Sequence, residues 1–401
     1  MKRIGMILDK AFPPDPRVEN EARVLLDDGH EVYLFCLDID GKTNEENVNG
    51  IQVKRYGSSN FEYKMSALAY SVPVYSWLLR GRIEEFLRKF QIEVIHVHDM
   101  VVAETVNQAN QSLKLPLVLD LHENRPEIMS FYPHLQRFPG KYLVSIEKWK
   151  RKELELINKA DRTVVVTEEA KNDLIERTGI ESERILIMPN TVSSEFYRNF
   201  ELNEEIVERY RQKFVLLYIG DTGLRRGLLT AIEGLSLLAG RIPELTLVIV
   251  GSNSTDKVLV DRAKQLGVED RIDFEGWKEE NLFASYILAS SVCISPLHKN
   301  KHHDTTLANK LFQYMGFSRP ILASDVLAQE HIIENSKSGL VHRAEDADDF
   351  ANKCSTLYED KELRSTLGEN GRRFLETDFS LEKVSQSLRS YYRNSNESIT
   401  S

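Results

Sequence analysis

The chain has 401 residues, of which 41% are hydrophobic and 28% charged, and its formal charge is −10 at neutral pH. This length exceeds one ordinary hydrophobic core, so two domains are expected. The negative charge argues against non-specific binding to nucleic acid. No apolar run reaches the roughly 18 residues that a membrane-spanning helix needs.

The N-terminus and the cysteines point to a cytoplasmic protein. Met1-Lys2-Arg3 leads directly into a strand-like run instead of the apolar segment of a signal peptide. The three cysteines, Cys36, Cys293 and Cys354, are widely spaced and lie in apolar surroundings. Buried free thiols are therefore predicted, in preference to a disulfide framework or a zinc site.

In the first half of the chain, short β-rich runs alternate with helical patterns. The predicted strands are residues 4–8, 32–36, 94–97, 117–120, 163–166 and 185–190. A helix over 18–26, closed by Gly29, lies between the first two of them. This strand–helix–strand rhythm is typical of a doubly wound parallel sheet.

After a polar segment at 198–208, the second half repeats the rhythm. Its predicted strands are residues 214–219, 245–250, 272–274, 292–294 and 321–323. Helices are expected from Leu228, Lys257 and Asn281, so the α/β class holds for both domains. Ligands in open α/β sheets bind beyond the carboxyl ends of the strands. The residues that follow predicted strands are Gly220, Gly251, Gly276, Ser295, His98, Asp99 and His122.

A helix expected to begin near Thr305 carries the most informative polar face. Its apolar face would hold Leu307, Leu311 and Met315. Its polar face would hold Thr306, Asn309, Lys310 and Gln313. A cation and two amides beside the unpaired N–H groups of a helix start would bind an anion and hydroxyl groups.

Two groups of potential metal ligands are interpreted as loops. Asp38-Ile39-Asp40 follows a first-half strand among polar residues and fits a solvated loop. His302, His303 and Asp304 lack further ligands at a suitable spacing. They are expected to form a mobile polar loop over the anion site, and no metal is predicted.

Seven motifs in a fixed order resemble glycosyltransferase family 4. They are DPRVENEARVLLDDGHEV, VIHVHDM and DLHENRPE in the first half, and LYIGDTGLRRG, VIVG, FEGW and TTLANKLFQYM in the second. The family comprises retaining enzymes of the GT-B fold that use nucleotide-diphosphate sugars. The resemblance implies two Rossmann-like domains with parallel sheets facing across a cleft. Residues 1–195 would bind the acceptor and residues 196–378 the donor. Residues 379–401 would form a C-terminal helix, packing back on the first domain, and a frayed tail.

The resemblance also implies a role for individual residues. The catalytic residues would be His122, Arg226 and Lys310. The donor-binding residues would be Gly220, Arg226, Gly251, Trp277, Thr305, Thr306, Leu307, Asn309, Lys310 and Gln313. The acceptor-side residues would be Arg17, His98 and Glu123. At most one of His96 and His98 is expected to face the site, and Arg225 is expected to point to solvent.

Three positions depart from the pattern of the family. Gln313 and Thr305 fall where relatives place a pair of glutamates, and Asp221 falls on or near an arginine of the family. The implied function is transfer of a sugar to a hydroxyl of a glycan or glycolipid, in cell-surface polysaccharide or glycoconjugate synthesis. The sugar nucleotide would be the substrate, with no metal and no other cofactor. A non-catalytic sugar-nucleotide binder and a sugar-nucleotide epimerase remain as alternatives.

Two segments that mix aromatic and basic residues suit an anionic membrane surface, where a lipid-linked acceptor would lie. They are residues 63–90 and 137–152. Peripheral association with the inner face of the membrane is one interpretation. Core-facing aromatic rings with a solvated basic face are the other.

Overall fold

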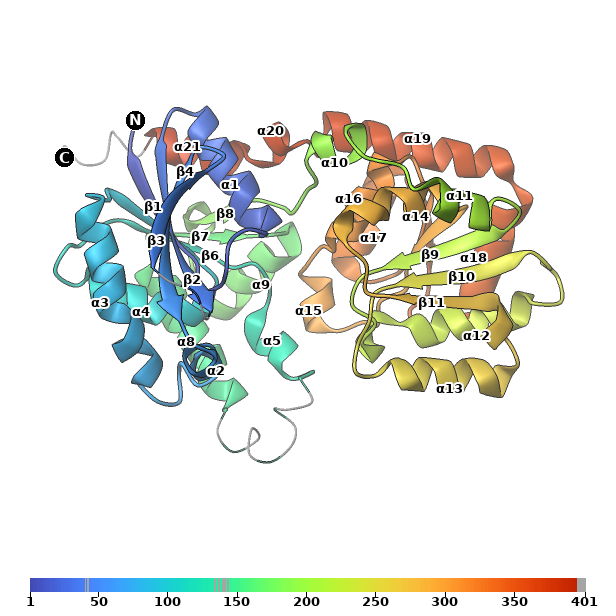
Figure 1. Cartoon of the computed structure of the whole chain (residues 1–401), viewed down its shortest axis with the longest axis horizontal. Helices are drawn as coiled ribbons and strands as arrows, with labels where there is room; N and C mark the ends of the chain where they lie inside the picture. Colours follow the sequence, from blue (N-terminus) through green and yellow to red (C-terminus); the bar gives the residue numbers. More distant parts are fainter. Residues whose placement is uncertain are drawn as a thin grey trace. The chain divides into compact units, whose positions relative to one another are not determined.

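The computed structural model describes residues 1–39, 41, 43–132, 135, 138, 142 and 144–394. Asp40, Arg137, Lys141 and the tail from residue 395 onward, on which some predictions rest, lie outside the described residues. The chain divides into two compact units (Figure 1). Unit 1 comprises Met1–Pro189 and the chain from Val384 onward, and unit 2 comprises Asn190–Lys383.

Unit 1 is built on an eight-stranded sheet in the order β3-β4-β2-β1-β5-β6-β7-β8. The strands are β1 (Arg3–Ile7), β2 (Glu31–Ile39), β3 (Asn44–Val48), β4 (Ile51–Ser58), β5 (Val94–His98), β6 (Leu117–Asp120), β7 (Arg162–Val165) and β8 (Ile185–Ile187). All neighbours are parallel except the β3–β4 pair at the edge. The sequence analysis did not predict that pair, because β3 is polar and exposed and so lacks an apolar pattern.

Helices cover both faces of the unit 1 sheet. They are α1 (Pro16–Asp27), α2 (Asn60–Ser66), α3 (Val74–Lys89), α4 (Met100–Asn110), α5 (Arg125–Met129), α8 (Ile146–Lys159), α9 (Glu168–Thr178) and α21 (Gln386–Asn394). Ile95 and Val97 of β5 pack into the apolar core with α3 and α4. His96 and His98 point to the other face, where α1 and α21 lie side by side (Figure 1).

The two histidines of β5 correct one expectation. Both rings are fully buried, and they stack with centroids 4.8 Å apart. Residues i and i+2 of a strand project from the same face, so His96 and His98 share one environment instead of alternating.

Unit 2 is built on a six-stranded parallel sheet in the order β11-β10-β9-β12-β13-β14. The strands are β9 (Phe214–Ile219), β10 (Leu245–Val250), β11 (Ile272–Gly276), β12 (Val292–Ser295), β13 (Ile321–Ser324) and β14 (Gly339–His342). Five of these match the predicted strands within two residues. The short β14 was not predicted, because only Leu340 and Val341 of its four residues are apolar.

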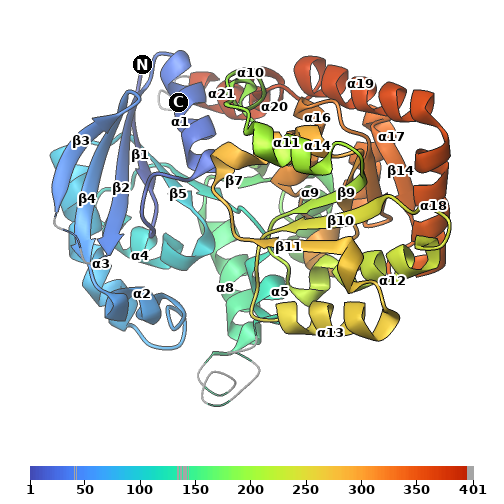
Figure 2. The same ribbon diagram turned by 45° about the vertical axis from the view of Figure 1, so that its right-hand side comes forward.

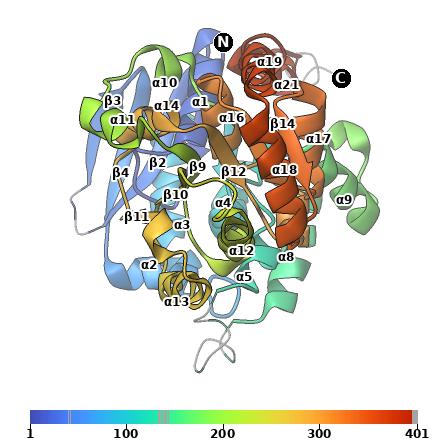
Figure 3. The same ribbon diagram turned by 90° about the vertical axis from the view of Figure 1, so that its right-hand side faces the viewer.

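Two apolar cores lie on the two faces of the unit 2 sheet. The helices are α10 (Ser194–Arg198), α11 (Glu204–Tyr210), α12 (Leu228–Leu238), α13 (Asp256–Leu266), α14 (Phe283–Ala289), α15 (Lys301–Asp304), α16 (Asn309–Gly316), α17 (Leu327–Ser336), α18 (Ala347–Glu359), α19 (Lys361–Thr377) and α20 (Leu381–Val384). Leu216 of β9 faces α12, α13 and α18, whereas Leu217 faces α14 and α16. Figure 2 and Figure 3 show α12 and α13 along one face and α14 and α16 along the other.

Burial of the cysteines agrees with the sequence. Cys36, Cys293 and Cys354 are free and buried, and burial raises the pKa of each thiol to about 12. Over the described residues, no helix is both long enough and apolar enough to cross a bilayer.

Candidate active site

Glycines bring the strand ends of unit 2 into close contact. Gly220 and Gly251 directly follow β9 and β10 and have φ values of 124° and 142°. A Cβ atom on Gly251 would lie 1.9 Å from the Gly220 carbonyl oxygen, and one on Gly227 would lie 1.6 Å from the Pro296 oxygen. Side chains cannot be accommodated at these distances, so the backbone itself forms the floor of the region.

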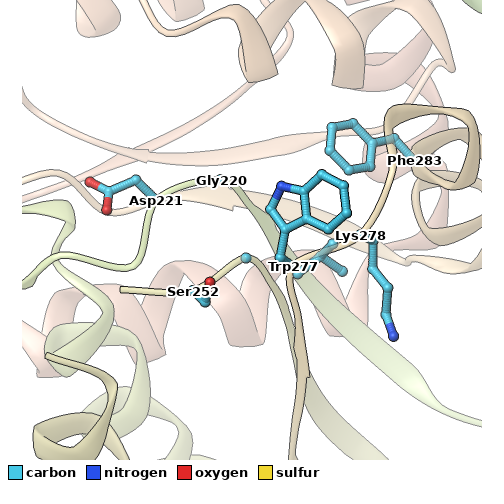
Figure 4. A pocket seen from close by; sticks show the side chains of 8 residues that line it. Gly220, Asp221, Ser252, Trp277, Lys278 and Phe283 are labelled. Carbon is cyan, nitrogen blue, oxygen red and sulfur yellow. The ribbon is translucent and has the colours of Figure 1, made fainter. Parts of the chain in front are cut away.

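A cavity of about 300 Å³ lies beyond these strand ends. Its lining residues are Gly220, Asp221, Val250, Gly251, Ser252, Trp277, Lys278 and Phe283. In Figure 4 the rings of Trp277 and Phe283 lie toward one side and the Asp221 carboxylate toward the other. The indole of Trp277 is 72% exposed. The cavity therefore offers an aromatic surface and a charged end within one space.

At the charged end of the cavity, the Asp221 carboxylate accepts hydrogen bonds from three neighbouring groups. It accepts hydrogen bonds from Asn253 Nδ2 at 2.7 Å, Arg226 Nε at 3.2 Å and the Gly223 amide at 3.3 Å. Burial alone would raise the pKa of Asp221, but Arg226 and Asn253 outweigh it and the pKa is lowered. Asp221 is therefore ionised and anchors Arg226.

Lys310 occupies an unusual position for a cation. Lys310 is only 8% exposed, and its Nζ atom lies 3.5 Å from the centre of the Tyr218 ring. Among the described residues, Nζ has no hydrogen-bond partner. Burial and the charge of Arg226 hold its pKa well below the usual value. A Cβ atom on Gly220 would be 3.4 Å from Nζ, so the amine lies directly beside the β9 strand end.

The helix expected from Thr305 begins at Asn309 instead, so that boundary was wrong. The hydroxyl of Thr305 donates to Lys301 O at 2.9 Å, and that of Thr306 donates to His302 O at 2.8 Å. Threonine side chains that bond to carbonyls of the preceding turn compete with helix formation. Both hydroxyls therefore close the short helix α15 in this structure.

Two further expectations about this segment are corrected. His302 and His303 lie in α15 and are buried, so they do not form a mobile polar loop. Leu307 packs in the apolar core of unit 2, and Asn309 is exposed at the start of α16. Of the predicted donor residues, the structure brings Gly220, Gly251, Trp277, Arg226 and Lys310 together around the cavity.

The sequence analysis missed Glu280 and assigned the wrong surroundings to Arg225. Gln313 donates from Nε2 to Glu280 Oε1 at 3.4 Å, so a carboxylate from a separate loop lies beside the amide. The Arg225 side chain is 15% exposed and lies 2.9 Å from His303, so the expectation that it points to solvent was wrong. No local pattern could reveal these pairs, because their members are 33 and 78 residues apart.

In unit 1, His122 follows β6 and lies against a buried carboxylate. Its Nε2 is 2.9 Å from Asp120 Oδ2 and 3.2 Å from His98 Nδ1. Burial would lower the pKa of His122, but the charge of Asp120 outweighs it and the pKa is raised. Burial lowers the pKa of His98. The surroundings therefore favour the protonated form of His122 and the neutral form of His98.

Arg17 forms an ion pair with the other oxygen of the Asp120 carboxylate. Its Nη2 is 2.5 Å from Asp120 Oδ1 and 3.0 Å from Glu21 Oε1. Ligand atoms of Glu21, His96, His98 and Asp120 all lie within 4.8 Å of one another, which is a spacing that a metal could use. The guanidinium of Arg17 already pairs with both carboxylates of this group, so one cation lies beside the cluster.

The third acceptor-side candidate, Glu123, lies in the loop after His122. Arg125 Nη1 donates to Glu123 Oε1 at 3.2 Å and lies 3.8 Å from Asp99 Oδ2. Arg17, His98 and Glu123 all belong to the strand-end region of unit 1, but Arg17 and His98 are buried. Arg17 contacts Asp120, and His98 contacts both Asp120 and His122.

Two doubly wound units with parallel sheets define an α/β protein of the GT-B fold. The solved structures that resemble the chain agree. Sucrose-phosphate synthase from Thermosynechococcus elongatus has a TM-score of 0.77 at 17% identity and covers 99% of each chain. Anabaena HepE in complex with UDP-glucose has a TM-score of 0.72 at 14% identity, covering 98% of this chain and 100% of that one.

Sequence comparison gives the family. The family described as "Glycosyl transferases group 1" matches residues 199–374, and "Glycosyltransferase Family 4" matches residues 17–196. Alpha-D-kanosaminyltransferase from Streptomyces kanamyceticus is 24% identical over 79% of this chain and 81% of its own length. The chain belongs to glycosyltransferase family 4 and is a transferase.

Proposed function

We propose that this glycosyltransferase moves a sugar from a nucleotide-diphosphate sugar to a hydroxyl of a glycan or glycolipid, with retention at the anomeric carbon. The inference that the donor is a nucleotide-diphosphate sugar rests on the surroundings of Lys310. A buried amine without a hydrogen-bond partner in the described part of the chain, beside Arg226 and a 300 Å³ cavity, needs an anion. The diphosphate of a sugar nucleotide supplies that anion, and Trp277 offers a surface for the base.

The proposed reaction develops negative charge on the departing diphosphate. Cations placed in advance around the leaving oxygens stabilise this charge more in the transition state than in the ground state. Arg226, held by Asp221, and Lys310 fill this role without a metal. The acceptor hydroxyl attacks from the face that the diphosphate leaves, and a diphosphate oxygen takes its proton.

His122 serves the sugar end of the donor in this proposal. Its imidazolium form donates a hydrogen bond to a hydroxyl of the transferred sugar, while Asp120 fixes the ring. The HepE structures contain UDP and UDP-glucose, which makes uridine diphosphate the first nucleotide to test.

A non-catalytic binder is the second candidate. It is favoured by Gln313, an amide where relatives use a carboxylate, because charge-assisted hydrogen bonds are about twice as strong as neutral ones. Glu280 weakens this alternative, because it places a carboxylate next to Gln313.

The test combines binding with turnover. A thermal-shift panel of UDP, GDP, ADP and their sugars is expected to show one stabilising base, since a ligand at 100 times its Kd adds about 2.7 kcal/mol. Donor hydrolysis or transfer should follow with that sugar nucleotide and be lost in Arg226→Ala and His122→Ala. Arg211→Ala, an exposed arginine of the same unit as Arg226, is the control.

Each other outcome selects a different conclusion. Binding without turnover over a panel of acceptors supports the binder. Conversion of the sugar nucleotide without any acceptor supports an epimerase. No shift with any nucleotide contradicts the donor-site assignment.

We also propose that the acceptor is lipid-linked, in cell-surface polysaccharide or glycoconjugate synthesis, and that unit 1 meets an anionic membrane. Trp77 of α3 and Phe61 and Tyr63 of α2 are exposed, whereas Tyr75 of α3 and Trp149 of α8 are core residues. Sedimentation with phosphatidylglycerol vesicles tests this. Trp77→Ser combined with Phe61→Ser should abolish sedimentation, and unchanged binding by this variant would contradict the proposal.

A further inference from the structure

Unit 2 has a second cavity, at the opposite end of its sheet from the cavity that Trp277 lines. Its volume is about 460 Å³, within the range of roughly 300–1,000 Å³ that is typical of small-molecule sites. Ser291 directly precedes β12 and Pro320 directly precedes β13, whereas the cavity at Trp277 follows the ends of β9, β10 and β11. All neighbouring strands of this sheet are parallel, so the two cavities are separate. The lining residues of the second cavity are Ser290, Ser291, Ser318, Arg319, Pro320, Lys361, Arg364, Ser365 and Glu369.

Three cationic side chains line the second cavity, and none of them forms an ion pair with a carboxylate of the described residues. Arg319 donates from Nε to the Ile287 carbonyl at 3.0 Å and from Nη2 to the Leu288 carbonyl at 2.6 Å. Lys361 is exposed at the first position of α19. The cations therefore differ from most charged side chains of unit 2, which pair with acids.

Carbonyl groups also hold the third cation, Arg364. Its Nη1 donates to the carbonyls of Leu357 and Tyr358, the latter at 2.8 Å. Burial lowers the pKa of both guanidiniums, and for Arg364 it outweighs the opposing charge of Asp360. Arginine stays protonated in proteins, so this burial costs free energy that a bound anion would offset.

Hydroxyl groups line the same cavity. Ser318 forms no side-chain hydrogen bond within the described part of the chain. Ser291 Oγ accepts from the Val215 amide at 3.2 Å, which leaves its own proton for another acceptor. Ser365 Oγ donates to Glu369 Oε1 at 3.1 Å, and Glu369 is the one carboxylate of the lining. Three cations and one carboxylate give the lining a formal charge of +2.

The wall of the second cavity is fixed by close backbone packing. A Cβ atom on Gly368 would lie 2.0 Å from Ser318 O, so α19 and the turn before β13 meet backbone to backbone. Arg319 and Arg364 belong to these two segments, and their carbonyl partners lie in the last turns of α14 and α18. The donors are therefore in place before a ligand binds.

We propose that the second cavity binds the phosphate group of a small hydroxylated molecule, with a sugar phosphate as the ligand class. Phosphate oxygens are strong acceptors with up to two negative charges, which match two guanidiniums, an ammonium and serine hydroxyls. The cavity has room beyond a phosphate, and there the Glu369 carboxylate is an acceptor for sugar hydroxyls. This ligand is separate from the sugar nucleotide, and its binding does not depend on the proposed transfer reaction.

Calorimetry of the full chain with glucose 6-phosphate, inorganic phosphate and glucose tests the ligand class. Glucose 6-phosphate is expected to bind more tightly than inorganic phosphate, and glucose should give no heat of binding. Equal affinities for the two phosphates would overturn the sugar part of the proposal. No binding of either phosphate would overturn the whole of it.

Hydrogen exchange locates the site. Glucose 6-phosphate should slow exchange in residues 290–291, 318–319 and 361–369, and leave residues 220–221, 250–252 and 277–278 unchanged. Slower exchange only in the second group would place the ligand in the other cavity and overturn the proposal.

Lys361→Gln is the decisive variant, because the Lys361 amine forms no ion pair within the described residues and its loss leaves the fold intact. Affinity for glucose 6-phosphate should fall about tenfold, as expected for losing a charged hydrogen-bond donor. Lys257→Gln, which removes an exposed lysine from the first turn of α13, is the matched control and should bind as the wild type does. Equal affinities of these two variants would overturn the proposal.

Arg364→Lys tests the forked donor. This variant keeps the charge but loses the planar guanidinium, so about tenfold weaker binding of glucose 6-phosphate is expected. A lower melting temperature with wild-type affinity would show that Arg364 only caps α18, and would overturn its assignment as a ligand-binding residue.

Discussion

The amine of Lys310 lies where burial and neighbouring arginines disfavour its charge, yet the proposed ligand requires a cation there. Both statements hold if Lys310 takes up a proton when the anion binds. A bound diphosphate raises the pKa of Lys310, because an opposite charge within a few ångströms favours the charged form. Lys310 would then be neutral before binding and an ammonium afterwards.

We therefore predict that UDP binding takes up a proton. Uptake occurs at pH values between the lowered pKa of free Lys310 and the higher pKa of the complex, so affinity falls as the pH rises across this range and levels off above the higher pKa. Calorimetry in buffers with different ionisation enthalpies measures the uptake at neutral to mildly alkaline pH. Lys310→Met should abolish it. An enthalpy that is the same in every buffer for the wild type would contradict the prediction.

His122 presents the opposite case, a histidine whose charge the fold favours. Asp120 is fully buried 2.9 Å from His122 Nε2, and its charge raises the pKa of His122. His98, stacked on His96, contributes a neutral ring. The groups that face His122 are thus Asp120, His98, Arg17 and, more distantly, Asp99.

The pH profile of activity should show this charge. Because the pKa of His122 is raised above its usual value of about 6.5, the active imidazolium persists to higher pH and activity falls as the pH rises through that pKa. Asp120→Asn removes the stabilising carboxylate and should move this alkaline fall toward lower pH. A profile of kcat/KM against pH measures it. An unmoved fall in Asp120→Asn would assign it to another group.

At the residue scale, sequence motifs could predict Arg226 and Lys310 because each sits in a short pattern of fixed spacing. Arg225 and Glu280 could not be predicted in this way. Their environments depend on His303 and Gln313, which belong to other segments of the chain. Thr306 shows the reverse error, since it was assigned to the polar face of a helix, whereas its hydroxyl bonds to His302 O in its own turn.

At the scale of elements, the parallel strands of both units could be read from short β-rich runs, and β6, β9 and β10 have the predicted bounds. Apolar runs bounded by turn residues specify such strands locally. Element ends were less predictable. The start of α16 is set by side chains that cap α15, and the polar edge strand β3 is set by its pairing with β4.

The turn after β9 gives a prediction at this scale. Gly227 has a left-handed backbone, and a Cβ atom there would clash with Pro296 O. Gly227→Ala should lower the free energy of unfolding by at least about 2 kcal/mol and weaken UDP binding, since Arg225 and Arg226 lie in this turn. Urea denaturation measures the change.

Gly240 provides the control for this variant. A Cβ atom at Gly240 meets nothing within 4 Å, so Gly240→Ala should change stability by no more than about 0.5 kcal/mol. Equal stabilities of the two alanine variants would contradict the strain assigned to Gly227.

At the scale of the whole molecule, the chain returns to unit 1 after completing unit 2. Helix α21 buries Tyr392 and Leu388 fully, and the Tyr392 hydroxyl lies 2.9 Å from His96 Nδ1. Arg389 and Arg393 pair with Asp28 at the end of α1. The last helix is therefore part of the first unit, on the face that also carries His98 and Asp120.

We predict that Tyr392→Ala destabilises unit 1 by about 3 kcal/mol, the usual cost of truncating a buried aromatic side chain. Hydrogen exchange should show lost protection in β1, β5 and α1, with β9 to β14 unaffected. Ser390→Ala, on the exposed side of the same helix, should leave exchange unchanged. Equal loss of protection in both units would contradict the assignment of α21 to unit 1.

The sequence by itself determined the class of this protein, because β-rich runs, glycine turns and the order of the motifs can be recognised without knowledge of tertiary contacts. It also led to the prediction that Arg226, Lys310 and His122 are site residues, which the experiments above test. Only the tertiary structure decided which groups are charged and which are held. Burial of Lys310, the Asp120 contact of His122 and the His303 contact of Arg225 all depend on side chains brought together from distant segments. Protonation and orientation follow from that environment, which no spacing along the chain encodes.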